Sequence, residues 1–159
     1  MRISNFQTSR GQVTPTLPIA ALASGQVLFD AVAVNLPGPT HFNSRRGSID
    51  QLVVIDKGQK SVEIDFYFFS SDVTFGTPGA VPTISAADAL KFVGKITVSA
   101  WDDIGSAVVS RQPDFASIYF STPGTALYVA AVVNGAVTFA ADDLTIAVSA
   151  IIENVATSY

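Results

Sequence analysis

The stretch SVEIDFYFFSSD, Ser61 to Asp72, decides the fold because it reads as one β-strand with aromatic side chains on both faces. Successive side chains of a strand point to opposite faces, so Phe66 and Phe68 share one face while Tyr67 and Phe69 share the other. The first face is apolar throughout and is predicted to face the core. The second changes from charged to aromatic, so we expect its far end to be covered by a second layer of this chain or by another subunit.

Strand signals recur on both sides of this stretch. Short β-branched or aromatic runs, bounded by Gly, Pro, Asn or Asp, predict eight or nine strands. The runs are Gly25 to Val34, Ser48 to Asp56, Val62 to Phe69, Gly94 to Ala100, Ala116 to Phe120, Ala126 to Val133 and Leu144 to Ile152, with further strands near Arg2 to Gln7 and Ala107 to Arg111. Asn134-Gly135 has the residues of a two-residue hairpin turn between two apolar runs.

The periodicity of these runs favours two stacked sheets. Residues 94–100 and 144–152 alternate apolar with polar, which predicts strands with one solvent-exposed face. Residues 27–34 and 127–133 are apolar nearly throughout, which predicts strands buried on both faces. Residues 85–92, SAADALKF, carry a Ser three positions before Asp88 and predict one short capped helix. The fold class expected is an all-β antiparallel β-sandwich, jelly-roll-like, with one helix near 85–92.

The chain has the size of one domain preceded by an extension. Its 159 residues are enough to bury a core without disulfides. The first 24 residues contain Pro15 and Pro18 and show little periodicity. We therefore expect an N-terminal arm over residues 1–24 and a sandwich domain over residues 25–159.

The amount of charge is the most informative feature of the composition. Charged residues make up 14% of the chain, against about 25% in a typical soluble domain. The buried centres of subunit interfaces are depleted in charge, so this composition favours association with other subunits. A monomer whose surface is coated with Ser and Thr is the alternative. A net charge of −4 disfavours binding to nucleic acid, which would need neutralised phosphates.

Catalytic and metal-binding groups are scarce. The chain has no cysteine and one histidine, His41, and no GxSxG motif surrounds any serine. Asp102-Asp103 and Asp142-Asp143 have the oxygen ligands that calcium takes, but they lack EF-hand spacing and are typical turn residues. We predict no enzyme activity, no cofactor and no metal. The longest apolar run is too short to span a membrane, and the N-terminus has no apolar signal segment.

Candidate contact residues come from the aromatic strand, the predicted arm and one basic loop. Arg45 and Arg46 lie in that loop, next to His41, and suit either an acidic partner surface or solvent. Trp101, Tyr119 and Tyr128 are the rings of a sugar-binding platform, if they share a face. The predicted interface residues are Phe6, Leu17, Arg45, Arg46, Tyr67 and Phe69.

Two longer segments carry a family resemblance. IDFYFFSSDVTFGTPGAVPTISAADALKFVGKITV, Ile64 to Val98, joins an aromatic strand, a Thr/Gly/Pro loop, a capped helix and a Gly-led strand. ALYVAAVVNGAVTFAADDLTIAVSAI, Ala126 to Ile151, carries two closing strands. Together they resemble small jelly-roll virion proteins of tailed bacteriophages, of the capsid decoration or cement type, over about the C-terminal two thirds of the chain.

This resemblance implies a structural protein and not a catalyst. It would be made in the host cytoplasm and would sit on the capsid surface as a homotrimer. Its partners would be copies of itself and the major capsid protein, with no nucleic acid and no membrane. A carbohydrate- or receptor-binding sandwich of a tail or surface appendage is the alternative function.

Overall fold

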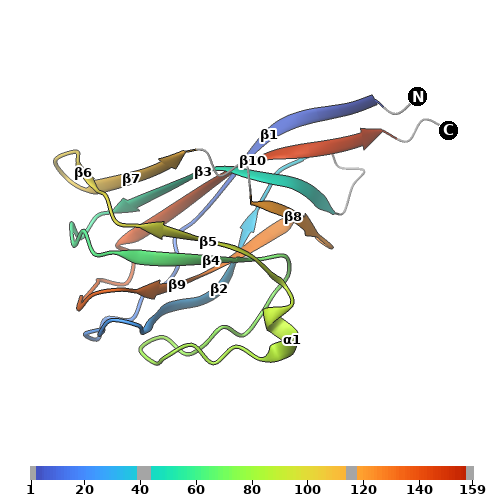
Figure 1. Cartoon of the computed structure of the whole chain (residues 1–159). Helices are drawn as coiled ribbons and strands as arrows, with labels where there is room; N and C mark the ends of the chain where they lie inside the picture. Colours follow the sequence, from blue (N-terminus) through green and yellow to red (C-terminus); the bar gives the residue numbers. More distant parts are fainter. Residues whose placement is uncertain (1–2, 39–43, 114–117, 157–159) are drawn as a thin grey trace.

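A computed structural model of the chain describes the backbone of residues 3–38, 44–113 and 118–156 (Figure 1). The described strands lie in two stacked sheets, and the described helix is a single turn beside the lower sheet in that view. The elements are β1 (Ile3–Val13), β2 (Val27–Asn35), β3 (Arg45–Asp56), β4 (Ile64–Phe69), α1 (Ala86–Ala89), β5 (Phe92–Val98), β6 (Asp102–Asp103), β7 (Val108–Pro113), β8 (Tyr119–Thr122), β9 (Ala126–Val133) and β10 (Leu144–Ala156).

The order of the strands is that of a jelly roll. One sheet has the order β1-β10-β3-β7-β6, with β8 also paired to β3, and the other has the order β2-β9-β4-β5. All of these pairings are antiparallel. The chain changes sheet at each step from β1 to β4 and again from β8 to β10, which is the winding of two Greek keys. The prediction of an antiparallel, jelly-roll-like sandwich with one short helix is confirmed.

The main core lies between the two sheets. Alternate residues of strands from both sheets point into it, as Ile64, Phe66 and Phe68 of β4 do with no exposed surface. Each such side chain contributes about 1.5–3 kcal/mol of apolar burial. The strands predicted to need cover on both faces, β2 and β9, lie side by side in the four-stranded sheet.

The segment predicted to be an arm is part of the sandwich in its described residues. Residues 3–13 form β1 and pair with β10 through the whole strand. Beyond β1, the Leu17 amide donates to the Ala141 carbonyl at 2.9 Å, and Leu22 exchanges two backbone hydrogen bonds with Val137. The Leu17 and Leu22 side chains are 3% and 4% exposed and belong to the main core. The boundary predicted at residue 24 therefore does not separate a detached arm from a domain.

Two inward-facing small residues explain why the strand predicted near Arg2 to Gln7 was not extended to Val13, the end of β1. Gly11 lies so close to the end of β2 that a Cβ there would stand 2.1 Å from the Asn35 carbonyl oxygen. Ser9 is buried, and its hydroxyl donates to the Pro37 carbonyl. Apolar side chains, which a periodicity search needs, do not fit where β2 crosses β1.

Two local expectations are also revised. The helix α1 covers four residues, because the chain after Leu90 turns into β5, which begins at Phe92. Asn134-Gly135 is not a two-residue hairpin turn. It opens a longer connection between β9 and β10, which lie in different sheets, and β9 pairs with β2 and β4 instead.

Candidate binding surfaces

An aromatic layer covers the outer face of β4. Tyr67 and Phe69 point away from the main core and meet Phe75, from the loop after β4, with ring centroids 5.0 and 5.8 Å apart. Phe92 of β5 closes the layer at 6.3 Å from Tyr67 and 5.9 Å from Phe69. Phe69 keeps 1% of its surface exposed. The cover expected over this face is therefore a loop of the chain itself.

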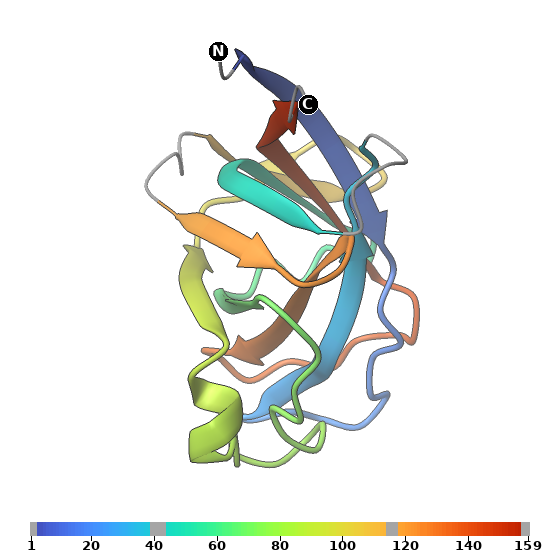
Figure 2. The same cartoon turned by 90° about the vertical axis from the view of Figure 1, so that its right-hand side faces the viewer.

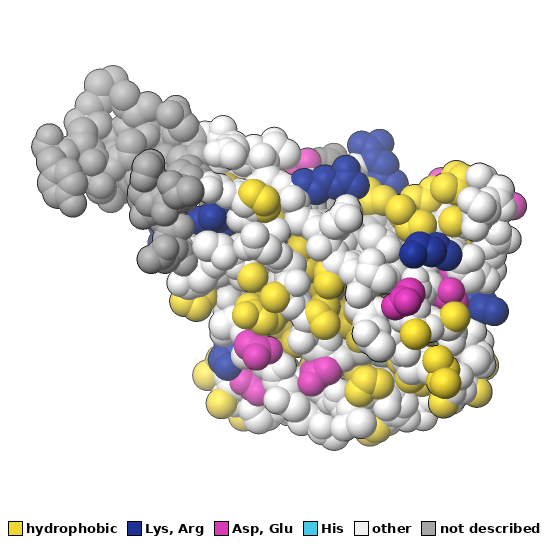
Figure 3. All heavy atoms as spheres, turned by 180° about the vertical axis from the view of Figure 1, so that it is seen from behind, with side chains coloured by type: hydrophobic (Ala, Val, Ile, Leu, Met, Phe, Trp, Pro, Cys, Tyr) yellow, Lys and Arg dark blue, Asp and Glu magenta, His cyan; other side chains and the backbone are white. Residues whose placement is uncertain are grey.

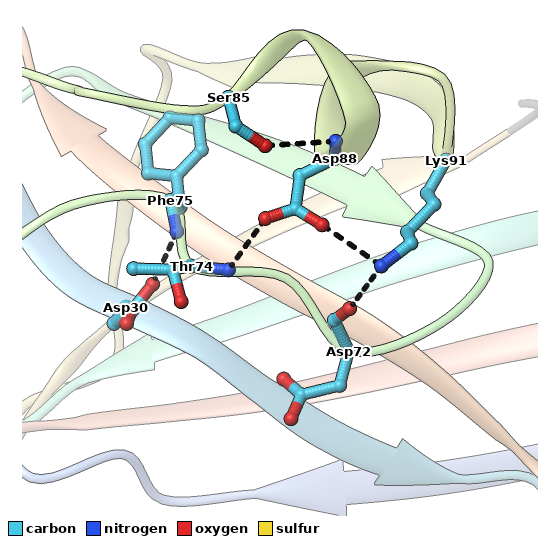
Figure 4. A network of polar contacts seen from close by, with 7 residues as sticks. All are labelled: Asp30, Asp72, Thr74, Phe75, Ser85, Asp88 and Lys91. Carbon is cyan, nitrogen blue, oxygen red and sulfur yellow. Dashed lines mark hydrogen bonds and ion pairs between the residues drawn. The ribbon is translucent and has the colours of Figure 1, made fainter.

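A polar network holds this loop in place (Figure 4). The Phe75 amide donates to Asp30 Oδ1 on β2 at 2.7 Å. The Asp88 carboxylate accepts from the Thr74 amide at 3.3 Å and from Lys91 Nζ at 2.8 Å. The Asp88 amide donates to Ser85 Oγ at the helix start, and Lys91 Nζ also donates to the Asp72 carbonyl. Backbone groups near the start of the loop are thus held by Asp30 on β2 and by Asp88 and Lys91 at α1.

Two carboxylates beside the aromatic layer are stabilised in their charged form. The Lys91 ammonium, through its hydrogen bond, lowers the pKa of Asp88 below its ordinary value, and the Thr74 amide adds to the effect. Burial opposes ionisation of Asp65, but hydrogen bonds from Thr97, Asn134 and Lys95 outweigh it and lower its pKa. Both groups therefore support the structure as anions.

A shallow apolar hollow of about 240 Å³ remains in the aromatic layer. It is open to solvent, because Phe92 in its lining is 48% exposed. The lining residues are Tyr67, Phe69, Phe75, Ile84, Ala89 and Phe92. No polar side chain except the Tyr67 hydroxyl contributes to the lining, so the hollow offers little to orient a ligand.

A second hollow lies on the outer face of the six-stranded sheet. Phe6 of β1 and Tyr119 of β8 are 70% and 76% exposed, and both line a depression of about 390 Å³. We call this the Phe6–Tyr119 surface; its lining residues are Phe6, Arg46, Gly47, Ser48, Tyr119, Phe120, Ser121, Ile151 and Glu153. Four strands, β1, β3, β8 and β10, contribute to it.

The pairing of distant strands builds this surface. Arg46 pairs with Ser121 and Ser48 with Tyr119, while β10 joins β1 to β3 and aligns Phe6 with Glu153. Tyr119 faces outward because its neighbour Phe120 is buried in the main core. Apart from Arg46 and Glu153, the lining residues carry no charge.

The predicted interface residues separate into two groups. Phe6 and Arg46 line the Phe6–Tyr119 surface. By contrast, Leu17, Arg45 and Phe69 are buried inside the chain. Tyr67 is half-buried beneath Phe75. The buried residues are not surface contacts, because the chain itself already covers them.

Burial of Arg45 has a local cause. Its side chain is 5% exposed, and its Nε and Nη1 donate to the carbonyl oxygens of Leu36 and Ser44 at 2.9 and 3.0 Å. The adjacent Arg46 points to the other face of β3 and is exposed. The two arginines are adjacent in the sequence and were expected to form one basic pair, but strand alternation places their side chains on opposite faces of β3. Alternation likewise signals Tyr119 and Ile151 as outward residues, since each neighbours a buried apolar residue.

The other candidate residues do not form a common site. Trp101 Nε1 donates to the Val62 carbonyl at 3.1 Å, and the ring packs on the main core. Tyr128 lies on β9, in the sheet opposite to Tyr119. The three rings of the predicted sugar platform therefore do not share a face. His41 lies outside the described residues.

The aspartate pairs take part in turns. Asp103 Oδ1 accepts from the Gly105 amide at 2.7 Å, and Asp143 Oδ2 accepts from the Ala140 amide at 2.8 Å. Within residues 3–38, 44–113 and 118–156, no group of three or more His, Cys, Asp or Glu side chains is placed to hold a metal ion. Over the same residues, no helix has the length and apolar character needed to cross a membrane.

Charge is sparse on the visible surface. Figure 3 shows one side of the molecule, where charged side chains form small separate groups among hydrophobic and uncharged polar ones. Such a surface resembles the centre of a protein interface more than a site for a charged ligand. No protein-family model matches the chain, and no curated protein is significantly similar to it. What the resemblance to phage decoration proteins implies about function therefore stays a prediction.

Proposed function

We propose that the protein is a structural component of a bacteriophage virion, a capsid decoration or cement protein that acts by surface contact and not by chemistry. The observation that carries this proposal is the Phe6–Tyr119 surface. It is an open depression on the outer face of the six-stranded sheet, with two highly exposed aromatic rings and two charged side chains, Arg46 and Glu153, in its lining. Exposed aromatic anchors in such hollows dominate the energy of protein interfaces. The homotrimer that the resemblance implies belongs to the same proposal.

The two rings define the chemistry of the contact. Phe6 and Tyr119 present large apolar area with few rotatable bonds, so their burial against a partner loses little conformational entropy. Arg46 and Glu153 at the same hollow would fix the orientation of the partner. The proposed partner is the outer surface of the capsid shell, formed by the major capsid protein.

Co-sedimentation with purified capsids of the encoding phage tests the proposal. Tyr119→Ala should raise the dissociation constant about thirtyfold or more, since an interface hot spot contributes about 2 kcal/mol or more. Val81→Ala is the matched control, because Val81 is also exposed, at 65%, but lies in the loop after β4. Capsid occupancy that is equal for the wild type and Tyr119→Ala would contradict the proposed surface.

A carbohydrate-binding role on a tail or appendage is the second candidate. The observation in its favour is that Tyr119 shares its hollow with Arg46, Glu153 and two serines, which could hydrogen-bond to sugar hydroxyl groups. Binding on a glycan array that Tyr119→Ala removes, together with no capsid binding by the wild type, would favour this role. Capsid binding without glycan binding would favour the decoration role.

A further inference from the structure

The free edges of the two sheets differ in how they are protected. A strand edge exposes unpaired backbone groups, and proteins usually cover it, shorten it or place charges on it. The edge of β2 is covered at its first residue, because Val27 exchanges backbone hydrogen bonds with Gly79 and Ala80 of the loop after β4, at 2.9 and 2.8 Å. That loop is the one held by the polar network of Figure 4.

Two other edges are charged or short. The edge strand β5 carries an exposed lysine, Lys95, at its centre. The edge strand β6 consists of Asp102 and Asp103 alone, and both are exposed. Each of these edges therefore has a feature that discourages pairing with another chain.

The edge strand β1 lacks this protection in the described part of the chain. It has 11 residues, ISNFQTSRGQV, with one charge at Arg10 and no proline. It pairs with β10 on one side, and Figure 2 shows no described strand beyond it. Phe6 on this strand is 70% exposed.

We propose that β1 pairs in antiparallel orientation with β1 of a second copy of this chain, so that the two six-stranded sheets become continuous. A pair centred on Thr8 places Thr8 opposite its own copy and Phe6 opposite Arg10 of the other copy. Phe6, Thr8 and Arg10 are all exposed at period two along the strand, so these pairs would form on the outer face. The strand is thus complementary to itself.

This register has favourable chemistry at each outward pair. Threonines opposite one another across antiparallel strands stabilise the pairing, and the Arg10 guanidinium would lie over the Phe6 ring. A register centred on Arg10 would instead place two like charges opposite each other, which is unfavourable. The complementarity argues for a second copy as the occupant of this edge over an unrelated strand.

The consequence for assembly follows from symmetry. An isologous contact of this kind links two copies, so it differs from the threefold contact of a trimer and would connect neighbouring oligomers. It also brings two Phe6–Tyr119 surfaces onto one continuous sheet. If the proposed function holds, this pairing makes capsid binding bivalent and increases the avidity. The pairing itself does not depend on that function.

Single-cysteine cross-linking tests the pairing, because the chain has no cysteine of its own. Thr8→Cys is expected to give a covalent dimer with a short thiol cross-linker. Gln12→Cys is the matched control on the same exposed face of β1. In the Thr8-centred register the two copies of residue 12 lie about 27 Å apart along the strands, beyond the reach of the reagent. Equal cross-linking of both variants, cross-linking of Gln12→Cys alone, or none would overturn the proposal.

Substitutions that introduce and then compensate a charge provide a second test of the pairing, in solution without capsids. Phe6→Lys places a lysine opposite Arg10 of the other copy, so self-association measured by light scattering should weaken at least tenfold. Adding Arg10→Glu should restore it through a Lys–Glu pair. Failure of the double variant to recover would contradict the register. A wild-type chain that binds capsids but does not self-associate would refute this pairing and leave the proposed function in place.

Discussion

The outer faces of the two sheets differ in whether a segment of the chain covers them. On the four-stranded sheet, the loop after β4 folds back and buries Phe69 beneath Phe75 and Phe92. On the six-stranded sheet no described segment does the same, and Phe6 and Tyr119 remain largely exposed around an open hollow. An aromatic residue is therefore not by itself a sign of an interface. What matters is whether the chain supplies its own cover.

The free edges of β2 and β1 differ in the same way. The loop that covers the aromatic layer protects the edge of β2 through Val27, whereas no strand among the described residues pairs with the outer edge of β1. The uncovered face and the unprotected edge meet at Phe6, which lies on β1 and lines the hollow. Burial within the chain thus explains one side of the molecule, and contacts with partners are proposed for the other.

The largest loss of stability is expected from removing an aromatic ring of the buried layer on the four-stranded sheet. Phe69→Ala leaves a cavity among Phe75, Phe92 and the strand, so the free energy of unfolding should fall by about 3–5 kcal/mol. Tyr119→Ala removes a ring of similar size from the uncovered face and should change it by about 0.5 kcal/mol or less. Urea denaturation of both variants measures the contrast. Similar losses for the two variants would show that Tyr119 is buried in solution.

A smaller loss of stability is expected from removing the hydrogen bonds that hold the loop after β4 over the aromatic layer. Asp30 Oδ1 accepts from the Phe75 and Gly76 amides and from its neighbour Ala31. Asp30→Ala leaves these amides without that acceptor and should cost about 1–3 kcal/mol. Asp30→Asn keeps a side-chain oxygen and should lose less. If the asparagine variant is as unstable as the alanine variant, the charge of Asp30 matters more than its role as an acceptor.

The sandwich could be predicted from the sequence because strand periodicity is local. Alternation around Phe66 and Phe68 correctly assigns the core face, and the need for a cover over Tyr67 and Phe69 follows from the same pattern. The identity of that cover could not be predicted, because Phe75 lies in a loop without periodicity. The edge strand β1 was underestimated because close approach of β2 requires small residues at its inward positions.

The candidate site was harder to predict than the fold. Phe6 and Arg46 were predicted as interface residues and are exposed, but the hollow that they form with Tyr119 depends on pairing between residues far apart in sequence. Asn134-Gly135 shows the same limit, since its local turn preference was overridden by the pairing of β9 with β2 and β4. Local patterns assign faces to strands, but they do not determine which strands are neighbours.

The smallest effect on stability is expected from neutralising Asp88, whose carboxylate holds the loop after β4 to α1. Its pKa is lowered in the folded protein by Lys91 first and then by the Thr74 amide. The charged form therefore stabilises the fold above the unfolded pKa of about 3.9, and this contribution is lost as the pH falls through the lower folded pKa. Because the group lies at the surface, solvent screens the interaction and the gain is small.

The pH dependence of Asp88→Asn tests this assignment. The wild type should be slightly more stable than the variant at neutral pH, and the difference should disappear in acid, once the pH has fallen below the lowered folded pKa of Asp88. Asp72→Asn is the matched control, because Asp72 meets Lys91 through its backbone carbonyl and not through its carboxylate. Urea midpoints measured from pH 2 to pH 7 give the comparison. A difference that persists unchanged at pH 2 would assign the effect to the shape of the side chain, and the cover would then be held by neutral hydrogen bonds alone.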